Sequence, residues 1–322
     1  MRPLLRVLGL IGLLLWPAVA IGQGFPNRPI HFVVPFPAGG PSDIISRVLT
    51  AKMSTILGQP VVVENRAGAG GLTGIAYVAR SHPDGYTVAI APSSGLAMNV
   101  TLRDDMPFQP LKDLALLTQI VSVPEILVVN EQVPAKSLAE LVALAKSQPG
   151  KLTFASTGGG NSVQLAAQLF AEMAHVTLTQ VPYKGNAPAL TDLVGGHIDL
   201  IFNGLTSALP LIKTDKLRAL AVTSLKRAGA LPDVPTIDES GLKGFEAVAW
   251  NGLTAPAATP REVIAKISAD VLKVVNSPEL KERLKSEGSD PVGDSPAEFA
   301  AFLRNEIAKW AKVIKFAKVK PE

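Results

Sequence analysis

Short apolar runs rich in β-branched residues alternate along this chain with stretches whose apolar residues recur at helical spacing. In the first part of the chain this alternation predicts strands at residues 29–35, 61–64 and 86–91 and helices at residues 41–57 and 72–80. The apolar face of the first helix would consist of Ile44, Ile45, Val48, Leu49 and Ile56. Strands that are apolar on both faces and linked by helices are typical of parallel pairing in an α/β domain.

The same alternation continues in the second part of the chain. It predicts strands at residues 125–129, 152–156, 176–181, 198–202, 217–222 and 246–253, and helices at residues 137–148, 162–174 and 188–195. Two α/β units therefore lie in tandem, and a loop-rich segment at residues 231–245 precedes the last predicted strand.

Two long helical patterns at residues 260–276 and 296–318 close the chain without strands of their own, and we expect them to cover the first unit. The last helix has an apolar stripe typical of core packing, made of Phe299, Phe302, Leu303, Ile307, Trp310 and Ile314. This arrangement requires two crossings between units, near residues 120–124 and 246–254. We predict a discontinuous first domain of residues 21–123 plus 247–322, a second domain of residues 124–246, and a ligand cleft between them.

Composition excludes several classes of function. The 322 residues are 47% apolar and 18% charged, which suits a globular protein of two domains. The net charge of +4 is small and scattered, so we expect no nucleic acid partner. The chain has no cysteine, which excludes disulfides, thiolate metal sites and the lipid anchor of bacterial lipoproteins.

The first twenty residues have the pattern of a secretory signal peptide. Arg2 and Arg6 precede an apolar run at residues 7–16, and small residues at Ala18 and Ala20 form a cleavage site. The alternative, a membrane anchor, is disfavoured because about 20 apolar residues are needed to span a bilayer. We therefore expect residues 1–20 to be removed and the mature chain to be a soluble protein of the periplasm, not a lipoprotein.

Two similar strand–loop–helix segments carry the strongest signal for a binding site. Residues 33–43 (VVPFPAGGPSD) and 154–162 (FASTGGGNS) each place glycines between a strand and a helix. Pro41 suits the first turn of its helix, and Asn161 can cap the other. Such loops direct backbone N–H groups and the positive end of a helix toward an anion. Glycines that merely form tight turns are the alternative, but two equivalent loops in two units favour a shared anion site.

Other motifs give little support for catalysis. The run Gly68–Gly74 (GAGGLTG) has Thr73 where a dinucleotide-binding loop needs Gly or Ala, and we interpret it as a close helix–strand contact. The chain has no phosphate-binding loop, zinc-protease motif or nucleophile elbow, so we expect no cofactor, no metal and no enzyme activity. Ser93 and Ser94 follow a strand and would serve as hydroxyl donors to a ligand. A periplasmic serine hydrolase using them is the rival interpretation.

The chain resembles the Bug-type solute-binding proteins of tripartite tricarboxylate transporters (TctC-like) over nearly all of its mature length. The resemblance is carried by VVPFPAGGPSDIISR, VVVENRAGAGG, HPDGYTVAI, FASTGGGNSVQLAAQLF, VPYKGNAPALTDLVGGHIDLIFNG, LRALAVTS, LPDVPTIDESGLKGFE and WNGLTAPAATP. It implies an α/β fold of the two-domain periplasmic binding protein type (type II-like), with two interdomain crossings.

The resemblance also implies that the two loops form a pincer whose amides and ordered waters grip one ligand carboxylate. The ligand-binding residues would be Phe36, Ala38, Gly39 and Asp43 on one side and Thr157, Gly158, Asn161 and Ser162 on the other. We expect Ser93, Tyr183, Asn203 and Trp250 to line the distal half of the pocket.

Two departures from the family pattern bear on the ligand. Gln164 stands where relatives often have His, and Asn203 stands where they often have Asp. Without a negative charge at position 203 the pocket should prefer a ligand without an amino group, such as a di- or tricarboxylate. The implied mechanism is domain closure in a monomer, followed by recognition by the membrane subunits of the transporter. Presentation of the ligand to a sensor kinase is the alternative that sequence leaves open.

Overall fold

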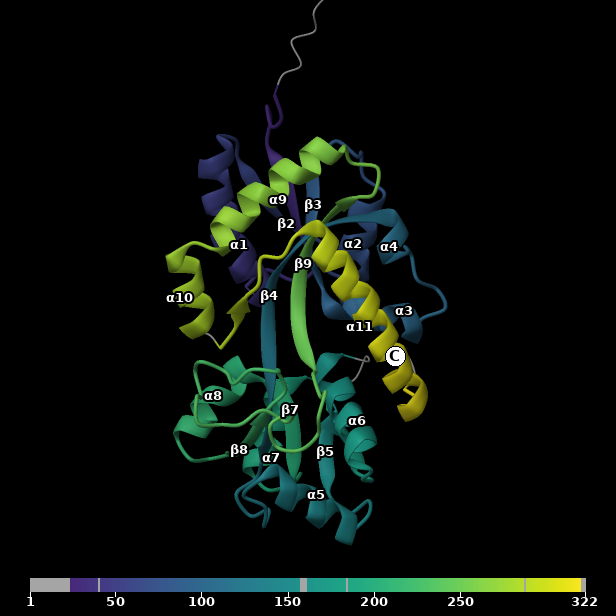
Figure 1. Ribbon diagram of the computed structural model, residues 1–322, viewed down its shortest axis with the longest axis vertical. Helices are drawn as coiled ribbons and strands as arrows, with labels where there is room; N and C mark the ends of the chain where they lie inside the picture. Colours follow the sequence, from purple (N-terminus) through teal and green to yellow (C-terminus); the bar gives the residue numbers. More distant parts are fainter. Residues whose placement is uncertain (1–23, 40, 157–160, 184, 287, 320–322) are drawn as a thin grey trace, which may run out of the picture.

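Two β-sheets share one long strand and form the two parts of the molecule (Figure 1). The computed structural model describes residues 24–39, 41–156, 161–183, 185–286 and 288–319, so the expected signal peptide lies outside it. The shared strand is β4 (Leu114–Val129). Up to Pro124 it pairs with β9 (Val248–Pro256), and from Glu125 onward it pairs with β7 (Leu200–Gly204). The change of partner between Pro124 and Glu125 marks the junction of the sheets.

The first sheet has the strand order β2-β1-β3-β9-β4. Strands β1 (Ile30–Val34), β2 (Val61–Asn65) and β3 (Thr87–Pro92) pair in parallel, whereas β9 runs antiparallel to β3 and β4. One core joins this sheet to α1 (Pro41–Leu57), α9 (Arg261–Val275) and α10 (Pro278–Ser286). On the other face lie α2 (Leu72–Ala79), the π-helical turn η2 (Ser94–Met98) and α3 (Asn99–Leu102).

The second sheet places β5 (Thr153–Ser156) between β6 (Thr179–Pro182) and β7, all parallel. Strand β8 (Arg218–Val222) pairs antiparallel with β4. The helices of this part are α5 (Leu138–Ser147), α6 (Ser162–Ala174), α7 (Asn186–Val194) and α8 (Leu205–Lys213).

The last helix, α11 (Pro296–Ala317), contacts both parts of the molecule. It packs against η2, α3 and β4, and also against α6 of the second part. Its expected apolar stripe is confirmed, because Phe299, Leu303 and Trp310 are completely buried in one core cluster with Phe170 of α6. Helix α11 thus packs on the first part, as expected, and in addition on α6 of the second part.

Several other sequence expectations need correction. Ile44 and Ile56 do not belong to the buried face of α1, since 40% and 41% of their surfaces are exposed. The first eleven residues of β4, the short helical segments η2 and α3, and helices α8 and α10 were not expected. The third strand of the second sheet begins at Thr179, later than expected, because residues 176–178 connect it to α6. The remaining expected strands and helices are present with ends that differ by at most three residues.

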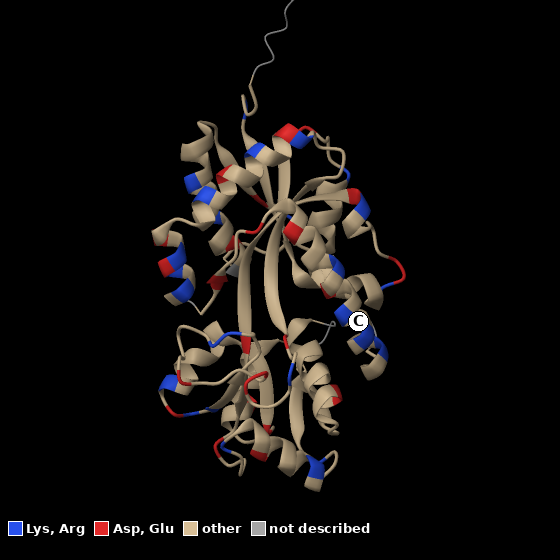
Figure 2. Ribbon diagram, viewed as in Figure 1, with Lys and Arg blue, Asp and Glu red and all other residues tan. Residues whose placement is uncertain are grey.

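Charged residues of both signs are interspersed over the two parts on the face that Figure 2 shows. Within the described residues, no helix combines the length and the apolar character needed to cross a bilayer.

Candidate functional site

The loops that follow the parallel strands meet at the junction of the two sheets. Pro92 pairs with Asn251 near the start of β9, so the carboxyl end of β3 points toward the second sheet. Gly204 pairs with Glu125, so the carboxyl end of β7 points toward the first. Because β1 is parallel to β3, and β5 and β6 to β7, all five strand ends lead to this junction.

Nine of the residues expected to bind the ligand therefore lie at the end of, or after, strands that end at the junction. They are Phe36, Ala38, Gly39, Asp43, Ser93, Asn161, Ser162, Tyr183 and Asn203. Thr157 and Gly158, also expected there, lie outside the described residues.

A buried carboxylate, Asp43, organises the first loop. Its side chain is 2% exposed and accepts hydrogen bonds from the Gly39 N–H at 2.9 Å, Arg47 at 2.8 and 3.1 Å, and Asn65 at 2.8 Å. The Arg47 guanidinium, then the Gly39 N–H and the Asn65 amide, hold the pKa of Asp43 well below its usual range. Asn65 also donates to the Phe36 carbonyl at 3.1 Å. Asp43 thus holds the shape of the loop.

The Gly39 N–H, in the loop expected to grip the ligand, donates to Asp43 in this structure. Gly39 has a φ of +83°, which a residue with a side chain rarely adopts. Ala38 and Gly39 are exposed, and Phe36 is half-buried. A Cβ atom at Gly71 would lie 3.5 Å from the Phe36 ring and 3.6 Å from the Pro92 ring. The first loop therefore lies close to the end of β3, where Ser93 is 3% exposed.

The second loop ends in the capped start of α6. The Asn161 side chain accepts the Gln164 N–H at 3.0 Å, as the sequence suggests. Helix α6 has 13 residues, long enough to present a positive end at the junction. Gln164 lies in its first turn and is 7% exposed. The Ser162 side chain hydrogen-bonds the carboxyl group of Glu125.

Sequence reasoning missed Glu125. The available signal was its position as the one charged residue in the otherwise uncharged run 114–129. It is 1% exposed, and burial raises its pKa to about 8, with only a smaller opposing effect from Ser162.

Two residues of the expected distal pocket differ in what they can offer a ligand. The Tyr183 hydroxyl donates to Asp192 at 2.7 Å, and burial together with Asp192 raises the pKa of Tyr183 to about 12. Asn203 is completely buried and accepts from the Ser207 hydroxyl at 3.4 Å. Its Nδ2 group has no hydrogen-bond partner among the described residues, which leaves a donor at the end of β7.

Trp250 does not line the junction, contrary to expectation. Its indole N–H donates to Glu306 Oε2 at 3.0 Å, and the same oxygen accepts the Trp310 N–H at 3.0 Å. The Trp250 ring packs edge-on against Phe299 and Phe302 beneath α11. The sequence placed this residue on the crossing strand but could not show that its side chain points into the core.

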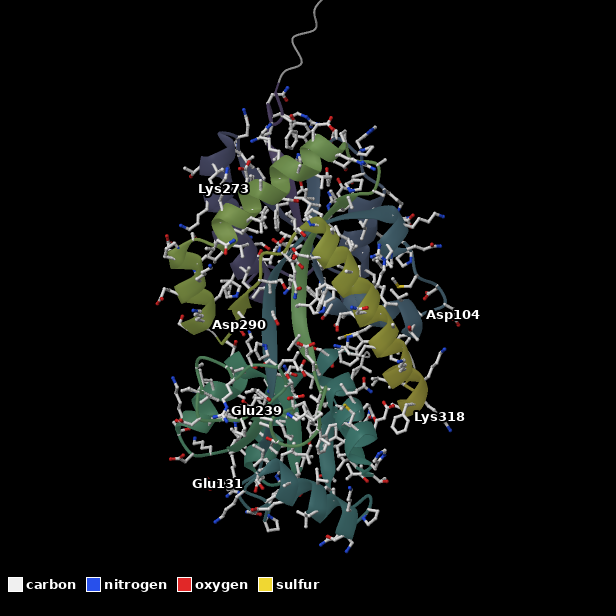
Figure 3. All side chains as sticks on the ribbon, in the orientation of Figure 1. Asp104, Glu131, Glu239, Lys273, Asp290 and Lys318 are labelled. Carbon is white, nitrogen blue, oxygen red and sulfur yellow. The ribbon has the colours of Figure 1, made fainter. Side chains whose placement is uncertain are left out.

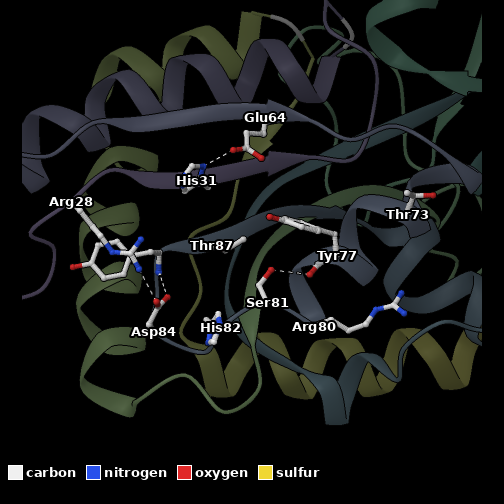
Figure 4. Close-up of a pocket in the computed structure, with 11 residues that line it drawn as sticks. Arg28, His31, Glu64, Thr73, Tyr77, Arg80, Ser81, His82, Asp84 and Thr87 are labelled. Atoms are coloured by element: carbon white, nitrogen blue, oxygen red, sulfur yellow. Dashed lines mark hydrogen bonds and ion pairs between the residues drawn. The ribbon is translucent and has the colours of Figure 1, made fainter.

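A hollow of about 660 Å³ lies away from the junction, on a flank of the first sheet (Figure 4). His31 and Thr87 line it from the beginnings of β1 and β3, opposite to the strand ends that meet at the junction. Its two acidic side chains have partners, since Asp84 pairs with Arg28 at 2.8 Å, and Glu64 contacts His31 at 2.5 Å and Arg66 at 3.1 Å. The described residues contain no cluster of three metal-ligating side chains.

Comparison with known proteins places this geometry in context. Residues 45–319 match the family described as the tripartite tricarboxylate transporter family receptor. Protein BugT of Bordetella pertussis is 35% identical over 96% of this chain and 97% of its own length. A solved structure of R. palustris Rpa4515 with adipate is 35% identical, with a TM-score of 0.78, and covers 92% of this chain and all of its own. MatC from Rhodopseudomonas palustris with bound malate is 33% identical, with a TM-score of 0.74, and covers 90% of this chain and all of its own.

Proposed function

The chain belongs to the tripartite tricarboxylate transporter receptor family of solute-binding proteins, and from this membership we propose that it captures a small carboxylate at the junction of its two sheets. The family consists of receptors and not of enzymes, which confirms the expectation of no catalysis and removes the serine hydrolase alternative. Adipate and malate occupy the similar solved proteins, and both are small dicarboxylates.

The observation that carries the proposal is the start of α6 at the junction, capped by Asn161 and facing the end of the first sheet. A helix N-terminus stabilises a carboxylate through its N–H groups and its dipole. We assign contact with the ligand to Phe36, Ala38, Ser93, Asn161 and Ser162, together with Thr157 and Gly158. Gly39 and Asp43 have the supporting role of holding the first loop in place.

The unpartnered Nδ2 group of Asn203 supports a ligand with a second acceptor group. A buried amide donor gains a hydrogen bond from a carboxylate or hydroxyl oxygen, whereas it repels an ammonium group. We therefore propose a di- or tricarboxylate without an amino group as the ligand.

The remaining parts of the proposal concern location and motion. We propose that residues 1–20 are a cleaved signal peptide, that the mature chain is a periplasmic monomer, and that membrane subunits of a tripartite transporter receive the ligand. The domains would be residues 21–123 plus 247–322 and residues 124–246. Closure would occur by twisting of the paired strands β4 and β9, since these form the crossing between the sheets.

Titration calorimetry of residues 21–322 with malate, adipate, citrate and glutamate tests the proposal. The decisive variant is Asn161→Asp, which keeps a capping side chain but adds a negative charge to the anion site. A unit charge at roughly 5 Å and an effective dielectric constant of about 20 costs about 3 kcal/mol, or about 100-fold in affinity.

Ser137→Asp is the matched control, because Ser137 caps α5 in the same way, accepting the Glu140 N–H at 3.2 Å. We expect carboxylate binding by the wild type and the control, and a large loss in Asn161→Asp. Absence of binding to any carboxylate would refute the proposed function, and equal affinities of the two variants would exclude α6 as the anion site.

A further inference from the structure

Glu125 lies at the point where β4 passes from the first sheet to the second. It forms the first residue pair of the second sheet with Gly204. Its backbone is fixed on both sides by Thr223, whose hydroxyl accepts the Glu125 N–H at 2.9 Å and donates to its carbonyl at 3.0 Å. The position of this carboxyl group relative to the junction is thus set by the sheet itself.

The Glu125 carboxyl group is buried beneath the start of α6 with only one side-chain partner. Its Oε2 atom has no hydrogen-bond partner among the described residues, so the bond to Ser162 involves the other oxygen. Ser162 is the first residue of α6 and one of the residues assigned above to ligand contact. The carboxyl group therefore touches the anion site through Ser162.

No ion pair with Glu125 is present among the described residues. Strands β7 and β9 and the rest of β4 contain no charged residue. Charged residues also lie on other neighbouring elements. They are Glu172 in α6, Lys213 in α8, Arg218 in β8, Lys226 after β8, Glu246 before β9, Asp290 (labelled in Figure 3) in the short strand β10 (Asp290–Pro291), and Glu298, Arg304, Glu306, Lys309, Lys312 and Lys315 in α11. Within the described part of the chain none of these forms an ion pair or hydrogen bond with Glu125, and Glu306 and Lys309 pair with each other.

An ionised Glu125 would compete with the ligand for the same stabilising groups. A buried carboxylate at this place would draw on the Ser162 hydroxyl and on the positive end of α6, which are the groups that a ligand carboxylate needs. Two carboxylates in one buried site repel each other strongly. Protonated Glu125, in contrast, is neutral and leaves the positive end of the helix to the ligand.

We propose that Glu125 is a positioning residue of the carboxylate site, and that each ligand molecule binds only to protein that carries a proton on Glu125. This inference rests on the proposed function and adds that ligand binding is coupled to protonation of Glu125. Carboxylate capture is then accompanied by proton uptake whenever Glu125 is ionised in the free protein. The raised pKa of about 8 predicts that uptake becomes visible in mildly alkaline solution.

The test measures malate and adipate affinity of the mature chain from pH 7 to pH 9.5. With a pKa near 8, affinity should fall roughly 30-fold over this range, since each unit above the pKa costs about tenfold. In Glu125→Gln the ratio of affinities at the two pH values should shrink to within about 3-fold, because the amide does not titrate. The control Glu246→Gln removes another carboxyl whose pKa burial raises, outside the anion site, and should keep the 30-fold ratio.

Calorimetry in buffers of different ionisation enthalpy gives a second readout on the wild type alone. It should show the uptake of about one proton per bound malate or adipate at pH 9, a result that a merely structural role would not produce. This readout decides the question even if Glu125→Gln does not fold. Binding without pH dependence or proton uptake would overturn the role of Glu125 and leave the proposed function intact. No binding of either compound at any pH would overturn both.

Discussion

Replacing Asp43 with asparagine removes the charge that holds the loop after β1 while it preserves the shape of the side chain. Four hydrogen bonds from three residues converge on this carboxylate. The introduced amide has one oxygen, so at least one of these donors would face an NH₂ group instead of an acceptor. We expect the loop to lose its fixed conformation and the protein to lose stability.

The magnitude follows from the burial of this ion pair. Breaking a buried pair costs about 3–5 kcal/mol. The Arg47 side chain is 54% exposed and can turn into water, which lowers the expected loss to about 2–3 kcal/mol. For a chain of this size that loss corresponds to a decrease of about 4–8 °C in the melting temperature. Affinity for carboxylates should fall as well, because Phe36 and Ala38 would no longer be held in position.

Urea unfolding of the wild type, Asp43→Asn and Asp105→Asn measures the effect. Asp105 is a matched control, since it also receives two hydrogen bonds from an arginine, Arg103, both at 2.9 Å. Its side chain is 73% exposed, so its removal should cost less than about 1 kcal/mol. Equal losses in the two variants would refute the assignment of Asp43 as the residue that fixes the loop.

The contribution of Asp43 should also depend on pH. Its pKa is lowered in the folded protein, so its stabilising effect is present above the unfolded value of about 3.9 and is lost as the pH falls below it toward the folded value. The difference in unfolding free energy between the wild type and Asp43→Asn should therefore shrink on acidification below about pH 4. Chemical denaturation at a series of pH values measures this difference. If it stays constant down to about pH 2.5, the charge of Asp43 is not the source of the stabilisation.

Two further substitutions test the packing around the junction. Gly74→Ala would bring a Cβ atom to 2.9 Å from the Arg66 carbonyl oxygen and 3.0 Å from the Pro35 Cα. Urea unfolding should show a loss of about 1–3 kcal/mol in unfolding free energy. The control Gly229→Ala, with open space around the new Cβ atom, should be nearly neutral. Glu306→Gln breaks the ion pair with Lys309, next to the oxygen that accepts the N–H groups of Trp250 and Trp310. Thermal unfolding should show a loss of about 1–3 kcal/mol in unfolding free energy. An unchanged stability would mean that the Glu306 charge is dispensable.

The sequence predicted most of the fold because its two α/β units follow regular patterns. It failed for the first part of β4, where Thr118, Gln119 and Ser122 interrupt the apolar run. The register of β4 against β9 shifts twice there, so the simple alternation of a strand is lost. Helix α8 was missed because it contains Pro210, a residue that normally ends a helix.

The sequence predicts those features of the candidate site that depend on neighbouring residues, and it misses those that depend on contacts distant in sequence. The two loops and the Asn161 cap depend on neighbouring residues, so local patterns reveal them. The fate of the Gly39 N–H, the inward orientation of Trp250 and the contact of Glu125 with Ser162 depend on pairings that only the folded chain establishes. Glu125 and Ser162 are separated by 36 residues in the sequence, and no spacing rule connects them.

The central place of β9 in the first sheet has a consequence for the order of folding. Strands β3 and β4 never pair with each other, because β9 lies between them. The strands that pair with β4 in the second sheet have all been synthesised once the chain reaches Val222. In the first sheet, β3 and β4 cannot be joined until residues 248–256, which form β9, have been synthesised. We therefore expect the second sheet to form early from nearby segments, and the first to close late and slowly through contacts distant in sequence. A nascent chain of this design remains incompletely folded until nearly four-fifths of it exists, which lengthens the interval during which it can still be handled as an unfolded polypeptide.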